Sequence, residues 1–120
     1  MHRLKEFQRS FSHALNGLKY VITHEKNFQN ELFLAILVVI AMIYFRVTRG
    51  EAIVLFLVIA GVLVMELLNT VVEKVVDILK PRVHPYAKLI KDLMAAGVLL
   101  ASLLAIIIGL LIFIPYIANK

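Results

Sequence analysis

The hydrophobic positions of this chain form three long runs without a charged residue, Leu32–Phe45, Ala52–Met65 and Leu93–Ala118. A helix rises about 1.5 Å per residue, and the hydrocarbon core of a bilayer is about 30 Å thick, so a span needs roughly 20 residues. The first two runs are shorter than that and must include flanking residues. We therefore predict an all-α integral membrane protein with transmembrane helices over 29–47, 51–80 and 86–118.

The first 28 residues follow a different pattern, with large apolar side chains recurring every three or four positions: Leu4, Phe7, Phe11, Leu15, Leu18 and Ile22. Basic residues fall elsewhere around the same predicted helix. A basic amphipathic helix beside a membrane span is typical of a helix that lies in the membrane interface. The alternative is a helix packed on the transmembrane bundle.

Short polar segments separate the predicted spans. Arg46–Glu51 reads as a turn between the first two. Pro81 should end the second span, which at 30 residues and about 45 Å is long enough to protrude beyond the hydrocarbon. Pro85 suits the first turn of the third span.

Composition supports the membrane interpretation, because 62% of the 120 residues are hydrophobic. A water-soluble domain of this size could not bury that much apolar surface. The formal net charge of +5 is better explained by membrane topology than by nucleic-acid binding, for which no motif is present. Cysteine is absent, which excludes disulfides and thiol catalysis. We expect no cleaved signal peptide, since the first apolar run starts only at Leu32 and lacks a small-x-small site.

The distribution of basic residues predicts the orientation. Ten lie on one side of the predicted spans (Arg3, Lys5, Arg9, Lys19, Lys26, Lys74, Lys80, Arg82, Lys88, Lys91) and three on the other (Arg46, Arg49, Lys120). Cytoplasmic segments carry the basic excess. The N-terminus and the second connection should therefore be cytoplasmic, and the C-terminus should lie outside.

Five polar residues follow the second apolar run at helical spacing: Glu66, Asn69, Thr70, Glu73 and Asp77. They share a stripe about 100° wide on one helix face, which we call the polar stripe. Carboxylates one and two turns apart repel one another unless a cation lies between them. Such an array beside the membrane favours cation binding or chemistry, the alternative being a solvated helix face.

The predicted topology brings the polar stripe, Glu25, His84, Lys91 and Asp92 together at the cytoplasmic face. Carboxylates that bind Mg²⁺, a lysine that neutralises phosphate charge and a carboxylate that accepts a hydroxyl proton suit phosphoryl transfer from a nucleotide to a lipid. The glycine-rich loops of P-loop enzymes and protein kinases are absent. From the residues alone, an ion-coupled transporter subunit or a small multidrug exporter is also possible.

The stretch ELLNTVVEKVVD (Glu66–Asp77), followed by His84-x-x-x-Lys88-x-x-Lys91-Asp92, resembles the bacterial diacylglycerol kinase/undecaprenol kinase family. Upstream, Gly17, Glu25 and Phe28 fit its pattern, so the resemblance covers nearly the whole chain. Ser10-Phe11 and His84-Pro85 are similar to the undecaprenol kinases of Gram-positive bacteria. One departure is Leu93-Met94, where the family usually has small residues.

The resemblance implies a homotrimer in the bacterial cytoplasmic membrane, with an N-terminal surface helix and composite active sites at the cytoplasmic face. It implies transfer of phosphate from ATP, with Mg²⁺, to undecaprenol, or alternatively to diacylglycerol. By position, Glu66 is the general base, Asn69 orients the reacting groups, and Glu25 and Glu73 hold the metal. The implied nucleotide contacts are His13, Arg82, Val83, His84, Lys91 and Asp92.

Three of these residues could also have a purely structural role, and only the resemblance to the family motif favours a functional one. Glu25 could be a solvated helix charge, and His84 a turn or cap residue. Lys91 could mark the lipid boundary by extending its ammonium group to water. The sequence assigns no role to Glu31 or Asp77.

Overall fold

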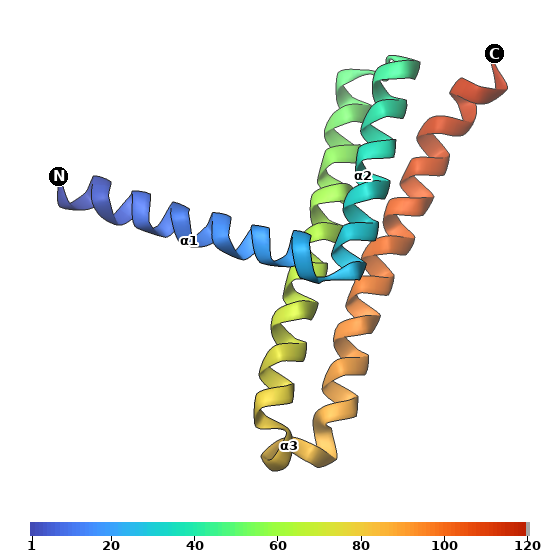
Figure 1. Cartoon of the computed structure of the whole chain (residues 1–120). Helices are drawn as coiled ribbons and strands as arrows, with labels where there is room; N and C mark the ends of the chain where they lie inside the picture. Colours follow the sequence, from blue (N-terminus) through green and yellow to red (C-terminus); the bar gives the residue numbers. More distant parts are fainter. Residues whose placement is uncertain (120) are drawn as a thin grey trace.

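The computed structural model describes residues 1–119, except for the side chain of Val83, and every regular element in that range is an α-helix. The helices are α1 (His2–His24), α2 (Lys26–Phe45) and α3 (Arg49–Ala118). α3 contains Pro81 and Pro85 and folds back on itself as a hairpin (Figure 1). Proline lacks the backbone N–H and disrupts the helical ladder, which explains a reversal at this point.

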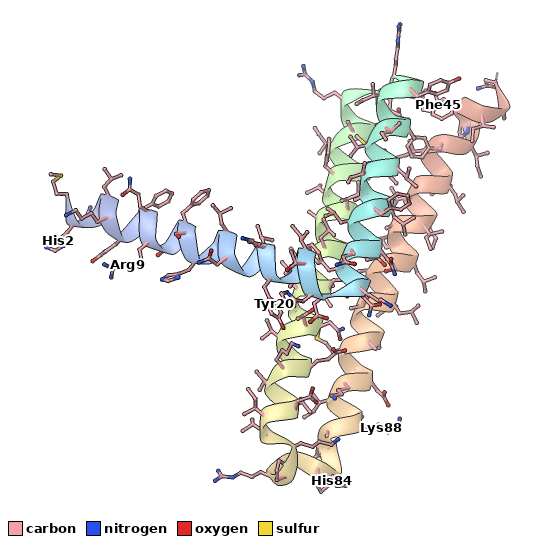
Figure 2. The ribbon with its side chains drawn as sticks, in the orientation of Figure 1. His2, Arg9, Tyr20, Phe45, His84 and Lys88 are labelled. Carbon is pink, nitrogen blue, oxygen red and sulfur yellow. The ribbon has the colours of Figure 1, made fainter. Side chains whose placement is uncertain are left out.

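Three segments are long and apolar enough to cross a membrane: α2, the first limb of α3 (Arg49–Arg82) and its second limb (His84–Ala118). This confirms the prediction of an all-α chain with three candidate spans. Many large apolar side chains on their outer surfaces are exposed, for example Leu57 at 67% and Leu111 at 68% (Figure 2). Such a surface suits hydrocarbon as the surrounding solvent.

α2 packs beside the hairpin, whereas α1 leaves the bundle at a steep angle (Figure 1). The hairpin continues well beyond the level at which α1 and α2 meet, so its closed end has no cover from α2. The level of the α1–α2 joint therefore divides a three-helix bundle from a two-helix extension.

The joint is a single residue, Glu25, whose backbone is extended at φ −106° and ψ 110°. The Thr23 hydroxyl donates to the carbonyl of Lys19 at 2.8 Å, a local bond that competes with regular helix geometry. We predicted a first helix to residue 28, but the structure ends it at His24 and starts α2 at Lys26. Glu25 thereby lies at a bend between helices.

The turn at the other end of α2 is also short. Arg46 adopts the left-handed conformation at φ 53°, and Thr48 is the N-cap of α3. The Glu51 N–H donates to Thr48 Oγ1 at 3.2 Å, while the Thr48 N–H donates to Glu51 Oε1 at 2.9 Å, which forms a capping box. The Tyr116 hydroxyl also donates to Glu51, so the open end of the hairpin is tied together.

Candidate functional site

The polar stripe on the first limb of α3 becomes progressively more exposed along the helix. Glu66 is 5% exposed and Asn69 and Thr70 are each 9% exposed, whereas Glu73 is half-buried and Asp77 is exposed. Polar side chains are costly to bury, so a merely solvated helix face does not explain the first three.

Two hydrogen bonds organise the stripe. The Asn69 Nδ2 group donates to Glu73 Oε1 at 3.2 Å, and the Thr70 hydroxyl donates to the backbone carbonyl of Glu66 at 3.0 Å. Within the described residues, the Glu66 carboxylate itself forms no hydrogen bond or ion pair. Its oxygens therefore remain available to another group.

The α1–α2 joint brings Glu25 against the first limb. Its Oε1 lies 3.5 Å from Lys74 Nζ, and the same ammonium lies 5.7 Å from the centroid of the Tyr20 ring. Lys74 therefore contacts the end of α1 and the joint at once. The contact places the Glu25 carboxylate beside the polar stripe, although the two are far apart in the sequence.

Four carboxylates gather at Glu66, one from α2, two from the first limb of α3 and one from the joint. Glu66 interacts electrostatically with Glu31 of α2, with Glu73 on its own limb and with Glu25 at the joint. The structure thus brings together Glu25, Glu66, Asn69 and Glu73, four of the residues that the sequence predicted to share a site. It also adds Glu31, to which the sequence assigned no role.

The donor set near this cluster suits a divalent cation only in part. Among the described residues, no three His, Asp or Glu groups are placed to hold a metal by themselves. Glu25 and Glu73 offer two carboxylates from different elements, and Mg²⁺ commonly uses one or two carboxylates with phosphate oxygens and water for the rest. The residues therefore fit a Mg²⁺ ion that arrives with a polyphosphate.

The second limb contributes two further ion pairs. Lys91 Nζ lies 2.7 Å from Asp77 Oδ1 and joins the two limbs, while Lys88 Nζ lies 2.6 Å from Asp92 Oδ2 one turn away. All four side chains are more than a third exposed, so these pairs contribute little to stability. Lys91 and Asp92 can therefore exchange these partners for a ligand.

Three predicted nucleotide contacts lie away from the carboxylates. His13 is exposed on α1, eleven residues before the end of that helix, which corresponds to about 17 Å. Arg82 and His84 are exposed at the closed end of the hairpin, where Figure 2 labels His84. The side chain of Val83 lies outside the described part of the chain. One chain therefore does not gather every predicted residue.

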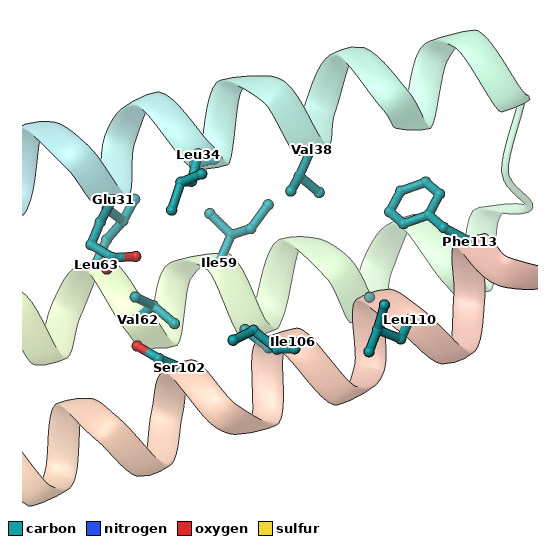
Figure 3. Close-up of a pocket in the computed structure, with 13 residues that line it drawn as sticks. Glu31, Leu34, Val38, Ile59, Val62, Leu63, Ser102, Ile106, Leu110 and Phe113 are labelled. Atoms are coloured by element: carbon teal, nitrogen blue, oxygen red, sulfur yellow. The ribbon is translucent and has the colours of Figure 1, made fainter.

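A cleft of about 390 Å³ lies between α2 and the two limbs, at the level of the bundle (Figure 3). Glu31 and Ser102 are its polar residues, and the remainder of its lining is apolar. The sequence signals were a carboxylate beside an apolar run and a lone serine within another. Neither signal shows that the two residues share a cavity, because they come from different helices.

Comparison with known proteins gives a family match and several relatives. The family model for prokaryotic diacylglycerol kinase matches residues 12–113. The chain is 38% identical to the undecaprenol kinase of Bacillus subtilis over 95% of this chain and 93% of that protein. It is 35% identical to a diacylglycerol kinase of Synechocystis, over 88% of this chain and 61% of that protein. It is 32% identical to a diacylglycerol kinase of Haemophilus influenzae, over 87% of this chain and 90% of that protein. No solved structure gave a significant match.

Proposed function

Because the chain belongs to the prokaryotic diacylglycerol kinase family, and is therefore a membrane lipid kinase with ATP as co-substrate, we propose that its acceptor is undecaprenol and its product undecaprenyl phosphate. The similarity to an undecaprenol kinase over nearly the whole chain supports this acceptor. The observation that carries the proposed mechanism is the buried residue Glu66, whose carboxylate has no hydrogen-bond or ion-pair partner among the described residues and lies near Glu25 and Glu73.

Glu66 acts as the general base. Its carboxylate accepts the proton of the lipid hydroxyl while the hydroxyl oxygen attacks the γ-phosphorus of ATP and ADP leaves. The residue as a whole is only 5% exposed, which limits the solvation of its charged form. Asn69 orients the reacting groups, and its amide bond to Glu73 couples the base to the metal-binding end of the polar stripe.

Glu25 and Glu73 would hold Mg²⁺ together with the nucleotide phosphates. The ion would neutralise charge on the β- and γ-phosphates. Lys91 and Asp92 bind the nucleotide once they release Asp77 and Lys88. Arg82, Val83, His84 and His13 complete the nucleotide site. The separation of His13, Arg82 and His84 from the carboxylates in one chain supports a site shared between subunits.

The active assembly is a homotrimer in the bacterial cytoplasmic membrane, with α1 in the interface and the N-terminus and active sites facing the cytoplasm. The exposed apolar side chains of α1, such as Phe7 at 67% and Phe11 at 57%, support contact with a membrane surface. Native mass spectrometry of the detergent-released protein should give three times the chain mass of 13.6 kDa. A monomer or dimer that retains full activity would contradict the trimer.

Purified protein should phosphorylate undecaprenol from Mg-ATP in mixed micelles, without an ion gradient. We expect undecaprenol to be preferred over diacylglycerol by at least about tenfold in kcat/KM, measured with labelled ATP and both alcohols at equal mole fraction. A preference for diacylglycerol would leave the kinase assignment intact and change the acceptor. Transfer to neither alcohol would overturn the proposed function.

A further inference from the structure

Lys74 is a charged residue beside the polar stripe to which the proposed mechanism gives no role. It follows Glu73 directly and interrupts the apolar surface beside the polar stripe. A lysine there costs little if it points to water, but this one points to the joint, where it lies 3.5 Å from Glu25 Oε1. Its partner is therefore a residue that we propose as a Mg²⁺ ligand.

The Lys74 ammonium occupies one oxygen of Glu25, so it has to move before a metal can bind that oxygen. Magnesium binds carboxylate oxygen at about 2.0–2.1 Å, and an ammonium beside the same oxygen would repel the ion. The Lys74 side chain is 54% exposed and that of Glu25 24%, so the ammonium is free to swing away. Lysine has a long flexible stem and readily follows a phosphate as a point charge.

A second contact shows what the pair holds in place. The Lys74 ammonium also lies 5.7 Å from the centroid of the Tyr20 ring, near the end of α1. A cavity of about 640 Å³ opens beside it between α1 and the first limb, lined by residues that include Gly17, Tyr20, Thr70 and Lys74. Lys74 therefore holds the end of α1 and the joint against α3, at the edge of this cavity.

Resting on the proposed function, we propose that Lys74 is a positioning residue that exchanges Glu25 for nucleotide phosphate when Mg-ATP binds. Without a divalent cation, its ammonium neutralises Glu25 and holds the joint on α3. With Mg-ATP, Glu25 turns to the metal and the ammonium moves to phosphate oxygens held by the same ion. Lys74 therefore opposes binding of a bare cation and favours binding of the cation with its nucleotide.

These two effects have opposite signs, which a purely structural ion pair would not produce. We expect Lys74→Met, which keeps most of the side-chain length, to bind Mn²⁺ alone about threefold more tightly than the unaltered protein. The same variant should bind ATP about fivefold more weakly at saturating Mn²⁺. The measurements are electron paramagnetic resonance of free Mn²⁺ and equilibrium binding of labelled ATP, both on the full chain in micelles without lipid acceptor.

Lys80→Met is the matched control, since Lys80 is exposed on the same limb and forms no ion pair in the described structure. It should change neither affinity. In a Glu25→Gln background, Lys74→Met should no longer tighten Mn²⁺ binding. Lys74→Arg, which keeps the charge, should retain both affinities within about twofold and serves if Lys74→Met folds poorly.

Three failures are distinguishable. If Glu25→Gln weakens Mn²⁺ binding but Lys74→Met leaves it unchanged or weakens it, the exchange is wrong and the proposed metal site stands. If neither Glu25→Gln nor Glu73→Gln alters Mn²⁺ binding, the proposed metal site fails and the role of Lys74 fails with it. Tighter Mn²⁺ binding without weaker ATP binding would overturn the transfer to phosphate.

Discussion

Replacing Glu66 with glutamine is expected to lower turnover by about 10²–10⁴-fold while ATP affinity stays nearly intact. Glutamine preserves the shape of a side chain that is only 5% exposed. The carboxylate has no hydrogen-bond partner within the described chain, so the amide breaks no internal contact. The loss should therefore report the missing base. Steady-state transfer to the lipid alcohol and equilibrium binding of labelled ATP would check it.

Glu66→Asp is the informative companion, because it keeps a carboxylate and withdraws it by one methylene. It should retain more activity than Glu66→Gln if the group acts as a base. Glu6→Gln, an exposed position on α1, controls for the loss of one negative charge and should behave as the unaltered protein. Equal losses for the aspartate and glutamine variants would show that shape, and not proton transfer, is what Glu66 supplies.

The three spans could be predicted from the sequence because crossing hydrocarbon sets a length that few soluble helices meet. The joint at Glu25 could not, since it lies in the polar stretch between Ile22 and Phe28, which contains no glycine or proline to mark the end of a helix. The bend is accompanied by local hydrogen bonds such as that of Thr23, which periodicity does not report. The capping box was readable as Thr48-x-x-Glu51, but we predicted only a polar turn there.

The polar stripe could be predicted for a similar reason, because residues on one face of one helix are related by local spacing alone. Contacts between helices are different. Lys91 lies 14 residues from Asp77, and Lys74 pairs with Glu25 from another element, so neither partner follows from periodicity. The sequence showed Lys74 as an interruption of an apolar surface and gave no reason for it.

The same difference between local spacing and contacts between helices explains why some predicted site residues lie far apart in one chain. Glu25 and the polar stripe meet because the α1–α2 joint lies against the first limb of α3, where Glu25 pairs with Lys74 and interacts electrostatically with Glu66. His13 and His84 lie on parts of the chain that lead away from this level. Local patterns identify such residues as unusual, but their grouping depends on how helices, and in our proposal subunits, are arranged.

Replacing Glu73 with glutamine is expected to act on the metal and not on the base. The Asn69 amide can still donate to the side-chain oxygen of the glutamine, so the hydrogen bond at 3.2 Å should survive. What disappears is the negative charge. Loss of a supporting residue around a metal costs about 10–100-fold in affinity, and loss of a direct ligand should cost at least about tenfold. We therefore expect the Mg²⁺ concentration for half-maximal activity to rise by that factor, with part of the activity recovered at high Mg²⁺.

Asp77→Asn provides the comparison, since it removes a carboxylate one turn further along the same helix. Asp77 pairs with Lys91 and is exposed, so its loss should leave the Mg²⁺ requirement unchanged. An equal rise in both variants would mean that general negative charge, and not a ligand at Glu73, attracts the ion. If the Glu73 variant kept its Mg-ATP affinity while the Glu66 variant lost it, the two roles would be exchanged. The ion would then sit at the buried end of the polar stripe, and the proton acceptor would be the carboxylate nearer to water.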